Sequence, residues 1–193
     1  MHKSIQRSLL PLFIFLTLAG FQGCAGYHTK VESPFGIKTI FVPTVRNIIP
    51  LQDMLIYVPG MEVDMTNAVI QRFNFDGSLK VVSRKEDADA TLYINLTRFD
   101  QEGVRFTNLE SVEEYRLFIT ADIKLKDNKT DETLLKEKNF TGRSSYFRQT
   151  SKGNVRNNGQ SFREPLQEVL KPATQKTIID FAHNVVDIIT EAW

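Results

Sequence analysis

The sequence predicts an α/β two-layer sandwich, in which a mixed sheet of about four to five strands carries two helices on one face. Three observations lead to this fold class. The segment Tyr115–Lys126 alternates strictly between apolar and polar residues, as a half-buried strand does. Two other segments, Met61–Phe73 and Leu166–Ile189, carry apolar residues at helical spacing. The expected elements follow in the order strand, helix, four strands, helix.

The first half of the expected fold begins with a strand at Lys38–Thr44. A helix is expected over Met61–Phe73, and the pair Asp76-Gly77 stops it. A short strand at Leu79–Ser83 comes next. The segment Ala90–Phe99 then alternates between apolar and polar residues, which predicts another half-buried strand.

The second half begins with the long strand at Tyr115–Lys126. A turn at Asp127–Lys129 leads to a more polar return strand, Leu134–Tyr146, so that the two strands form a hairpin. The segment Thr150–Gln160 is rich in Asn, Gly and Ser, which predicts a polar loop.

A capping box marks the start of the last helix. In Ser161–Glu164 the serine hydroxyl and the glutamate carboxylate can satisfy amide donors at a helix N-terminus. The apolar face that follows reaches the end of the chain, and we expect Pro172 to divide or kink this helix.

The first residues have the layout of a secretory signal peptide. Lys3 and Arg7 make the start positive, and the apolar run that follows, Leu9–Leu18, is too short to span a bilayer comfortably. The only cysteine of the chain, Cys24, lies directly after the small residue Gly23, at the expected cleavage point. This position predicts a lipoprotein acylated at Cys24.

The expected organisation has three parts. Residues 1–23 form a signal peptide, residues 24–36 a lipidated N-terminus and tether, and residues 37–193 a single periplasmic α/β domain. The other interpretation is an ordinary secreted protein with one spare thiol, cleaved slightly further along the chain.

Charge and motifs exclude several classes of function. Without the signal peptide the chain loses two of its 24 basic residues and none of its 23 acidic ones, so the net charge becomes −1 and no overall positive field attracts nucleic acid. The motifs of nucleophilic hydrolases, zinc proteases, nucleotide-binding loops and dithiol sites are absent from the sequence, which predicts no catalytic residues, no metal and no cofactor.

The acidic clusters and His183 also give no sign of a catalytic or metal site. His183 lies on the last helix beside a core position, where a structural or surface role is expected. Two acidic clusters are expected in solvated turns: Glu86, Asp87 and Asp89 precede the strand Ala90–Phe99, and Glu110, Glu113 and Glu114 precede the strand Tyr115–Lys126.

Basic residues on the expected strands form the main candidate surface. If some of them share a sheet face with Phe118 and Phe140, that face would present cations beside apolar surface, which suits a phosphorylated amphiphile. The other interpretation is a solvated face whose cations are balanced by nearby acids. The residues concerned are Arg98, Lys124, Lys126, Lys136, Lys138 and Arg143.

Several segments together resemble the LptE family of lipopolysaccharide-assembly lipoproteins. They are Cys24–His28, Ile40–Pro43, the Met61–Phe73 helix, Leu79–Val82 and the strand entry Ala88–Leu92. The resemblance implies an outer-membrane lipoprotein that sits inside a β-barrel translocon of the LptD type, plugs its lumen, and binds lipopolysaccharide without catalysing a reaction.

By position, the basic residues that contact lipid in this family resemble Arg105, in an expected loop before the long strand, and Lys152 or Arg156, in the loop before the last helix. Two functions of other kinds stay open. The chain could be an envelope lipoprotein that activates a peptidoglycan synthase, or a periplasmic hydrolase whose site the sequence does not reveal.

Overall fold

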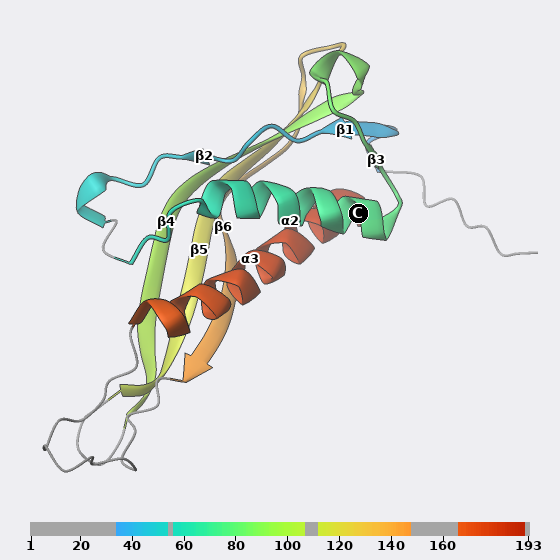
Figure 1. The fold of residues 1–193 in the computed structure, drawn as a ribbon. Coiled ribbons are helices and arrows are strands. Elements are labelled where there is room, and N and C mark those ends of the chain that lie inside the picture. Colours follow the sequence, from blue (N-terminus) through green and yellow to red (C-terminus); the bar gives the residue numbers. More distant parts are fainter. Residues whose placement is uncertain (1–33, 54–55, 107–111, 148–165, 192–193) are drawn as a thin grey trace, which may run out of the picture. The chain divides into compact units, whose positions relative to one another are not determined.

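Two helices cover one face of a mixed sheet, and the three long strands of that sheet form an antiparallel meander (Figure 1). The computed structural model describes residues 34–53, 56–106, 112–147 and 166–191, all within a compact unit that spans Glu32–Trp193. The elements are β1 (Thr39–Phe41), β2 (Arg46–Asn47), the 3-10 helix η1 (Leu51–Asp53), α2 (Met61–Asp76), β3 (Lys80–Val81), the 3-10 helix η2 (Lys85–Asp87), β4 (Ala90–Phe106), β5 (Val112–Asp127), β6 (Thr133–Phe147) and α3 (Leu166–Thr190).

In the first part of β4 and in β5, apolar side chains that point to the helices are buried, whereas β6 is more polar and only Gly142 and Tyr146 of it are buried. The turn between β5 and β6 is stabilised by Asp127, whose carboxylate accepts hydrogen bonds from the N–H groups of Lys129 and Thr130 at 2.7 and 2.8 Å. Facing residues of β4 and β5 are at most 3% exposed: Leu92 opposite Leu125, Ile94 opposite Ile123, and Leu96 opposite Ala121.

The outer edge of β4 is covered by short parallel strands along part of its length. The sheet order is β3-β1-β4-β5-β6, and β2 also pairs with β4 further along the same edge. Pro43, which has no N–H to donate, lies between β1 and β2 and separates the two pairings. The last bond of this parallel ladder joins the N–H of Ile48 to the carbonyl of Leu96 at 2.9 Å.

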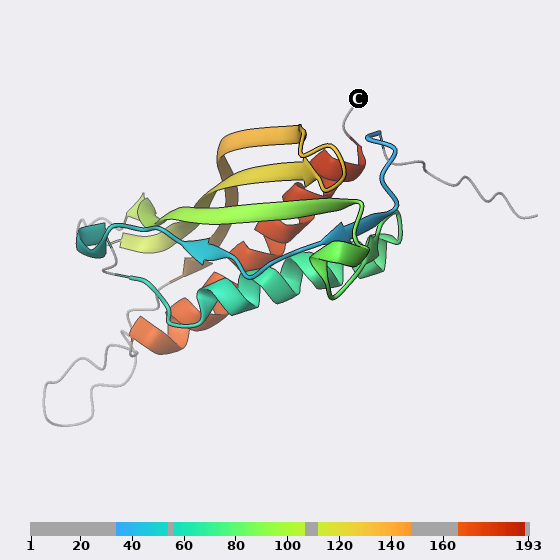
Figure 2. The same ribbon diagram turned by 90° about the horizontal axis from the view of Figure 1, so that it is seen from above.

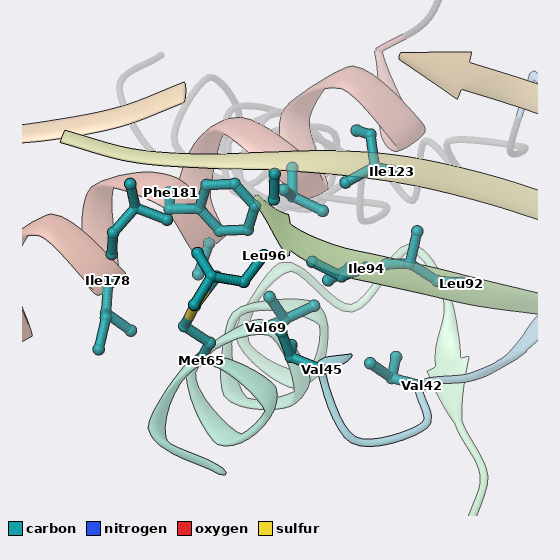
Figure 3. Close-up of a cluster of buried hydrophobic side chains, with 14 of the residues drawn as sticks. Val42, Val45, Met65, Val69, Leu92, Ile94, Leu96, Ile123, Ile178 and Phe181 are labelled. Carbon is teal, nitrogen blue, oxygen red and sulfur yellow. The ribbon is translucent and has the colours of Figure 1, made fainter. Parts of the chain in front are cut away.

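The helix layer is packed against the inner face of the sheet (Figure 2). Figure 3 shows Met65 and Val69 of α2, with Ile178 and Phe181 of α3, gathered against the side chains of β4. At its C-terminal end, α2 is closed by a left-handed glycine, Gly77, whose N–H donates to the carbonyl of Phe73 at 2.9 Å.

Helix α3 approaches β6 more closely than a side chain would allow. A Cβ atom added to Gly142 would lie 2.5 Å from the Cβ and 2.6 Å from the Cα of Phe181. Next to this contact, the Ser144 and Thr177 hydroxyls are 2.6 Å apart, and the ring of Phe140 meets that of Phe181 edge to face with 5.8 Å between centroids. The glycine therefore sets the distance between the two layers.

The structure confirms the predicted fold class and most of the elements. Helix α2 and strands β3, β5 and β6 lie where the sequence predicts them, and β1 lies inside the predicted Lys38–Thr44 strand. The pairing of β2 with β4 was not predicted. Helix α3 runs through Pro172 without being divided.

One prediction about β4 is wrong, and it concerns a candidate site residue. The strand does not end at Phe99 but continues to Phe106, so Arg105 lies on a strand and not in a loop. The extension is stabilised by pairing with β5, where Arg105 lies opposite Glu114. The expected sites at Cys24, Lys152 and Arg156, like the signal peptide, the polar loop and the capping box, lie outside the described residues.

Asp89, the residue just before β4, links the start of β1 to the turn between β5 and β6. The carboxylate of Asp89 accepts hydrogen bonds from the N–H groups of Lys38 and Thr39, both at 3.1 Å, and from the Thr39 hydroxyl at 3.0 Å. Its other oxygen accepts from the ammonium of Lys129 at 3.0 Å. Asp89 was expected in a solvated turn, but its side chain is only 28% exposed and joins β1 to the turn after β5.

These bonds lower the pKa of Asp89 to about 2, chiefly through the Lys129 ammonium and then through the Lys38 amide. Because the folded pKa lies below the ordinary value of 3.8, the carboxylate stabilises the fold above about pH 4, and this contribution is lost as the pH falls from about 4 to about 2. After allowance for solvent screening, the contribution is about 1 kcal/mol.

We therefore expect Asp89→Asn to lower the free energy of unfolding at pH 6 by about 1 kcal/mol, and to differ less from the unaltered protein at pH 2. Urea unfolding followed by circular dichroism at several pH values measures the difference. Asp87→Asn, which removes an exposed ion pair with Arg84, is the control and should change stability by less than about 0.5 kcal/mol. A constant deficit of Asp89→Asn from pH 6 to pH 2 would contradict this assignment.

Candidate functional site

The face of the meander that points away from the helices carries polar and charged side chains in rows across the strands. The strand register places Asp100, Phe118 and Arg143 in one row, Glu102, Arg116 and Ser145 in the next, and Arg105, Glu114 and Phe147 in the last. We call this surface the open face, and the last row the distal cluster.

The distal cluster joins a cation, an acid and an aromatic ring. The Nε atom of Arg105 lies 3.6 Å from a carboxylate oxygen of Glu114, and the guanidinium carbon lies 5.8 Å from the centroid of the Phe147 ring. The Glu114 side chain is 15% exposed, whereas that of Arg105 is 62% exposed. The acid and the ring thus position a guanidinium group that faces solvent.

The same strand ends carry exposed apolar residues. Phe106 is 61% exposed, Phe147 57% and Val104 39%. On the opposite side of the same strand ends, the rings of Tyr115 and Tyr146 are stacked at 5.4 Å, and the Tyr146 hydroxyl donates to Gln101 at 3.0 Å. This second layer of contacts holds the strand ends together.

A guanidinium beside an exposed aromatic ring suits an anionic amphiphile. Arginine presents five N–H donors in a planar arrangement that matches phosphate oxygens. In the distal cluster, the Nε atom of Arg105 is the one that faces Glu114. Because the Arg105 side chain is 62% exposed and its Nε is 3.6 Å from Glu114, water screens the ion pair, so it contributes little to stability and Arg105 can turn to a phosphate at small cost. The Phe147 ring, which lies beside the guanidinium, can contact a hydrocarbon chain.

A second group of cations lies nearer the other end of the open face. Lys124 and Lys136 lie directly opposite each other, and Tyr93 lies next to Lys124 on β4. Lys126 forms an ion pair with Asp131. Further along β4, Arg98 lies 3.5 Å from Asp100. The predicted cationic face and the predicted balance by acids are therefore both present.

The prediction that Phe118 and Phe140 share a face with these cations is wrong for Phe140. Phe118 lies on the open face, opposite Arg143, whereas Phe140 lies opposite Ala121 on the helix side and contacts Phe181. The reason is an irregularity in β6 at Asn139, whose left-handed φ of 54° accompanies an extra residue and reverses the alternation that follows it.

The structure adds two residues to the site that the sequence did not single out. Glu114 was expected in a solvated acidic turn, but it lies within β5 and faces Arg105. Phe147 is the last described residue before residues 148–165, and no pattern in the sequence marked it. His183 is exposed on α3, in agreement with the expected surface role.

In the described part of the chain, no three His, Cys, Asp or Glu side chains are grouped so that they could hold a metal ion. Among the same residues, none of the helices is both long enough and apolar enough to cross a membrane.

Residues 37–189 match the family model described as LptE, lipopolysaccharide-assembly. This match covers most of the chain. The chain belongs to the LptE family. No curated protein matches it in sequence.

Solved structures with a similar fold include a protein from Xanthomonas campestris, at 12% identity and a TM-score of 0.50, with 80% of this chain and 86% of that chain covered. The rare lipoprotein B from Shewanella oneidensis is 12% identical, with a TM-score of 0.45 and coverage of 80% and 96%. Lipoprotein B from Nitrosomonas europaea is 15% identical, with a TM-score of 0.44 and coverage of 87% and 88%. At these identities the first comparison supports the fold of this LptE-family chain and nothing beyond it.

Proposed function

We propose that this LptE-family chain is an outer-membrane lipoprotein, anchored through acylated Cys24, that binds lipopolysaccharide and plugs the lumen of a β-barrel protein of the LptD type. It acts by contact and catalyses no reaction. The observation that carries the proposal is the family match over residues 37–189, which spans both layers of the fold and the distal cluster.

The chemistry of the distal cluster supports lipopolysaccharide as the ligand. Lipopolysaccharide carries phosphate groups next to acyl chains, so its recognition needs a cation beside apolar surface. Arg105 supplies the cation and the Phe147 ring beside it supplies apolar surface, while Phe106 is a further exposed apolar residue at the same end of β4. Lys152 and Arg156 are proposed as further cations for the same ligand.

The composition of the open face supports the role of a plug. Its charged residues of both signs can form hydrogen bonds with the polar side chains that line a barrel lumen, and such an interface does not need a large apolar area. The acyl chains on Cys24 would each contribute about 0.8 kcal/mol per buried methylene group, which is enough to keep the domain at the membrane surface while it binds a barrel.

The partner is tested first by purification. Full-length protein extracted from membranes in mild detergent is expected to carry along a large outer-membrane β-barrel of the LptD type, identified by mass spectrometry. A Cys24→Ser variant, which cannot be acylated, is the control, and we expect it to leave the membrane fraction. Recovery of the chain alone, or with an inner-membrane enzyme such as a peptidoglycan synthase, would reject this partner.

The ligand is tested by reversing the charge of one arginine. Arg105→Glu should weaken lipopolysaccharide binding about tenfold or more, because a charge-assisted hydrogen bond contributes about 1.5–3 kcal/mol. Binding to purified lipopolysaccharide is measured by fluorescence titration.

Arg98→Glu is the matched control for this variant. Arg98 lies on the same strand, is 59% exposed and also faces an acid, but it lies outside the distal cluster. Equal losses in the two variants would indicate a general charge effect, and unchanged binding by Arg105→Glu would remove Arg105 from the site.

A further inference from the structure

The two outer edges of the sheet differ in how their backbone groups are satisfied. At the β6 edge, α3 supplies the partners: the N–H of Arg143 donates to the carboxylate of Asp180 at 2.8 Å, and the side chain of Asn184 donates to the carbonyl of Thr141 at 3.5 Å. An edge that is capped in this way cannot readily accept another strand.

The β4 edge is protected only along its first part. Strands β1 and β2 pair with it in parallel as far as Leu96, where the N–H of Ile48 makes the last bond. Beyond Leu96, β4 continues to Phe106. Within the described ranges, β5 is the only strand that pairs with this second part.

The hydrogen bonds show which residues of β4 direct their backbone groups outward. Because the N–H of Arg143 points to Asp180, away from β5, the facing residue Phe118 must direct its own backbone groups to the other side, toward Asp100. By the same alternation Glu102, opposite Arg116, also directs its backbone groups toward β5. The residues that alternate with Asp100 and Glu102 therefore point away from β5: Phe99, Gln101 and Gly103.

The parallel ladder gives the same result independently. The carbonyl of Leu96 points outward to Ile48, and the irregularity at Thr97 and Arg98 adds one residue, so Phe99 is the next to point outward. No hydrogen bond joins the backbone groups of Phe99, Gln101 or Gly103 to another described residue on this side. We call the segment Phe99–Gly103 the open edge.

The side chains of the open edge select the charge of a partner. Asp100 and Glu102 lie on the edge strand itself and point to the open face. Arg98 is the one cation within 4.0 Å of Asp100 among the described residues, and Arg116, opposite Glu102, lies one strand further from the edge. An acidic strand would be repelled here and a basic one attracted. On the helix side, Gly103 has no side chain and lies opposite Tyr115, so an apolar side chain from a neighbouring strand could contact the tyrosine ring.

We propose that the open edge accepts an extended segment of a partner polypeptide as an added strand, with basic side chains toward Asp100 and Glu102 and apolar side chains toward the helix layer. The outward N–H and C=O groups of three residues would supply the backbone hydrogen bonds, and the alternating side chains would supply the specificity. This proposal does not depend on lipopolysaccharide being the ligand.

The test uses the full-length protein in detergent and the synthetic peptide acetyl-Lys-Val-Lys-Val-Lys-Val-amide, which can pair in either direction. Amide hydrogen exchange is measured residue by residue. Peptide at millimolar concentration should slow exchange at Phe99, Gln101 and Gly103 at least tenfold, and should leave Asp100 and Glu102 unchanged because their amides already bond to β5. The acidic peptide acetyl-Glu-Val-Glu-Val-Glu-Val-amide should bind at least tenfold more weakly.

Two proline variants separate edge pairing from general adhesion. Gln101→Pro removes an outward N–H, together with the side-chain acceptor of the Tyr146 hydroxyl, without breaking the ladder to β5, so it should abolish the protection at Phe99 and Gly103. Ser145→Pro places the same change at the β6 edge, where it should have no effect on peptide binding. The comparison of the basic and acidic peptides on the unaltered protein holds even if a proline variant fails to fold.

Several outcomes would overturn the proposal. They are the absence of protection by the basic peptide, equal affinity for both peptides, and slow exchange at Phe99, Gln101 and Gly103 in the free monomer, which would mean that the chain itself covers the edge. A dimer that Gln101→Pro converts to a monomer would also overturn it, because the occupant would then be a second copy of this chain.

Discussion

The contact between Gly142 and Phe181 determines how the two layers of this protein meet. Because Gly142 has no side chain, the backbone of α3 lies directly on β6, close enough for Asp180 to cap the edge of that strand and for Ser144 to bond with Thr177. Helix α2 then packs beside α3, with Arg72 of one 3.2 Å from Asp187 of the other. One face and one edge of the sheet are thereby closed, and the open face and the open edge are left for binding.

This division explains why stability and function occupy different parts of the molecule. Most apolar side chains of β4 and β5 point to the helix side, where they are almost fully buried. The charged residues on the other side are solvated and contribute little to stability, so they can exchange partners at small cost. A member of the LptE family that works by contact, as we propose for this chain, needs such a surface more than it needs a cavity.

The sequence predicted those elements whose alternation or helical spacing is regular. Tyr115–Lys126 and Met61–Phe73 are examples. It failed where one extra residue shifts the pattern. The irregularity at Thr97 and Arg98 and the glycine at 103 interrupt the alternation, so the second half of β4, with Arg105, was read as a loop. The extra residue near Asn139 placed Phe140 on the other face. The contacts of Arg105 with Glu114 and Phe147 depend on the register between the strands, which no local sequence pattern specifies.

The most direct test of this account is the stability of Gly142→Ala, measured by urea unfolding with circular dichroism. The added methyl group must displace α3, so we expect a loss of about 1–3 kcal/mol together with faster hydrogen exchange at the Arg143 amide, whose cap depends on the position of the helix. Ser145→Ala, on the open face of the same strand, is the matched control and should change stability by less than about 0.5 kcal/mol. If Gly142→Ala changes neither the unfolding midpoint nor the exchange rate of the Arg143 amide, the claim that this contact sets the distance between the two layers is contradicted.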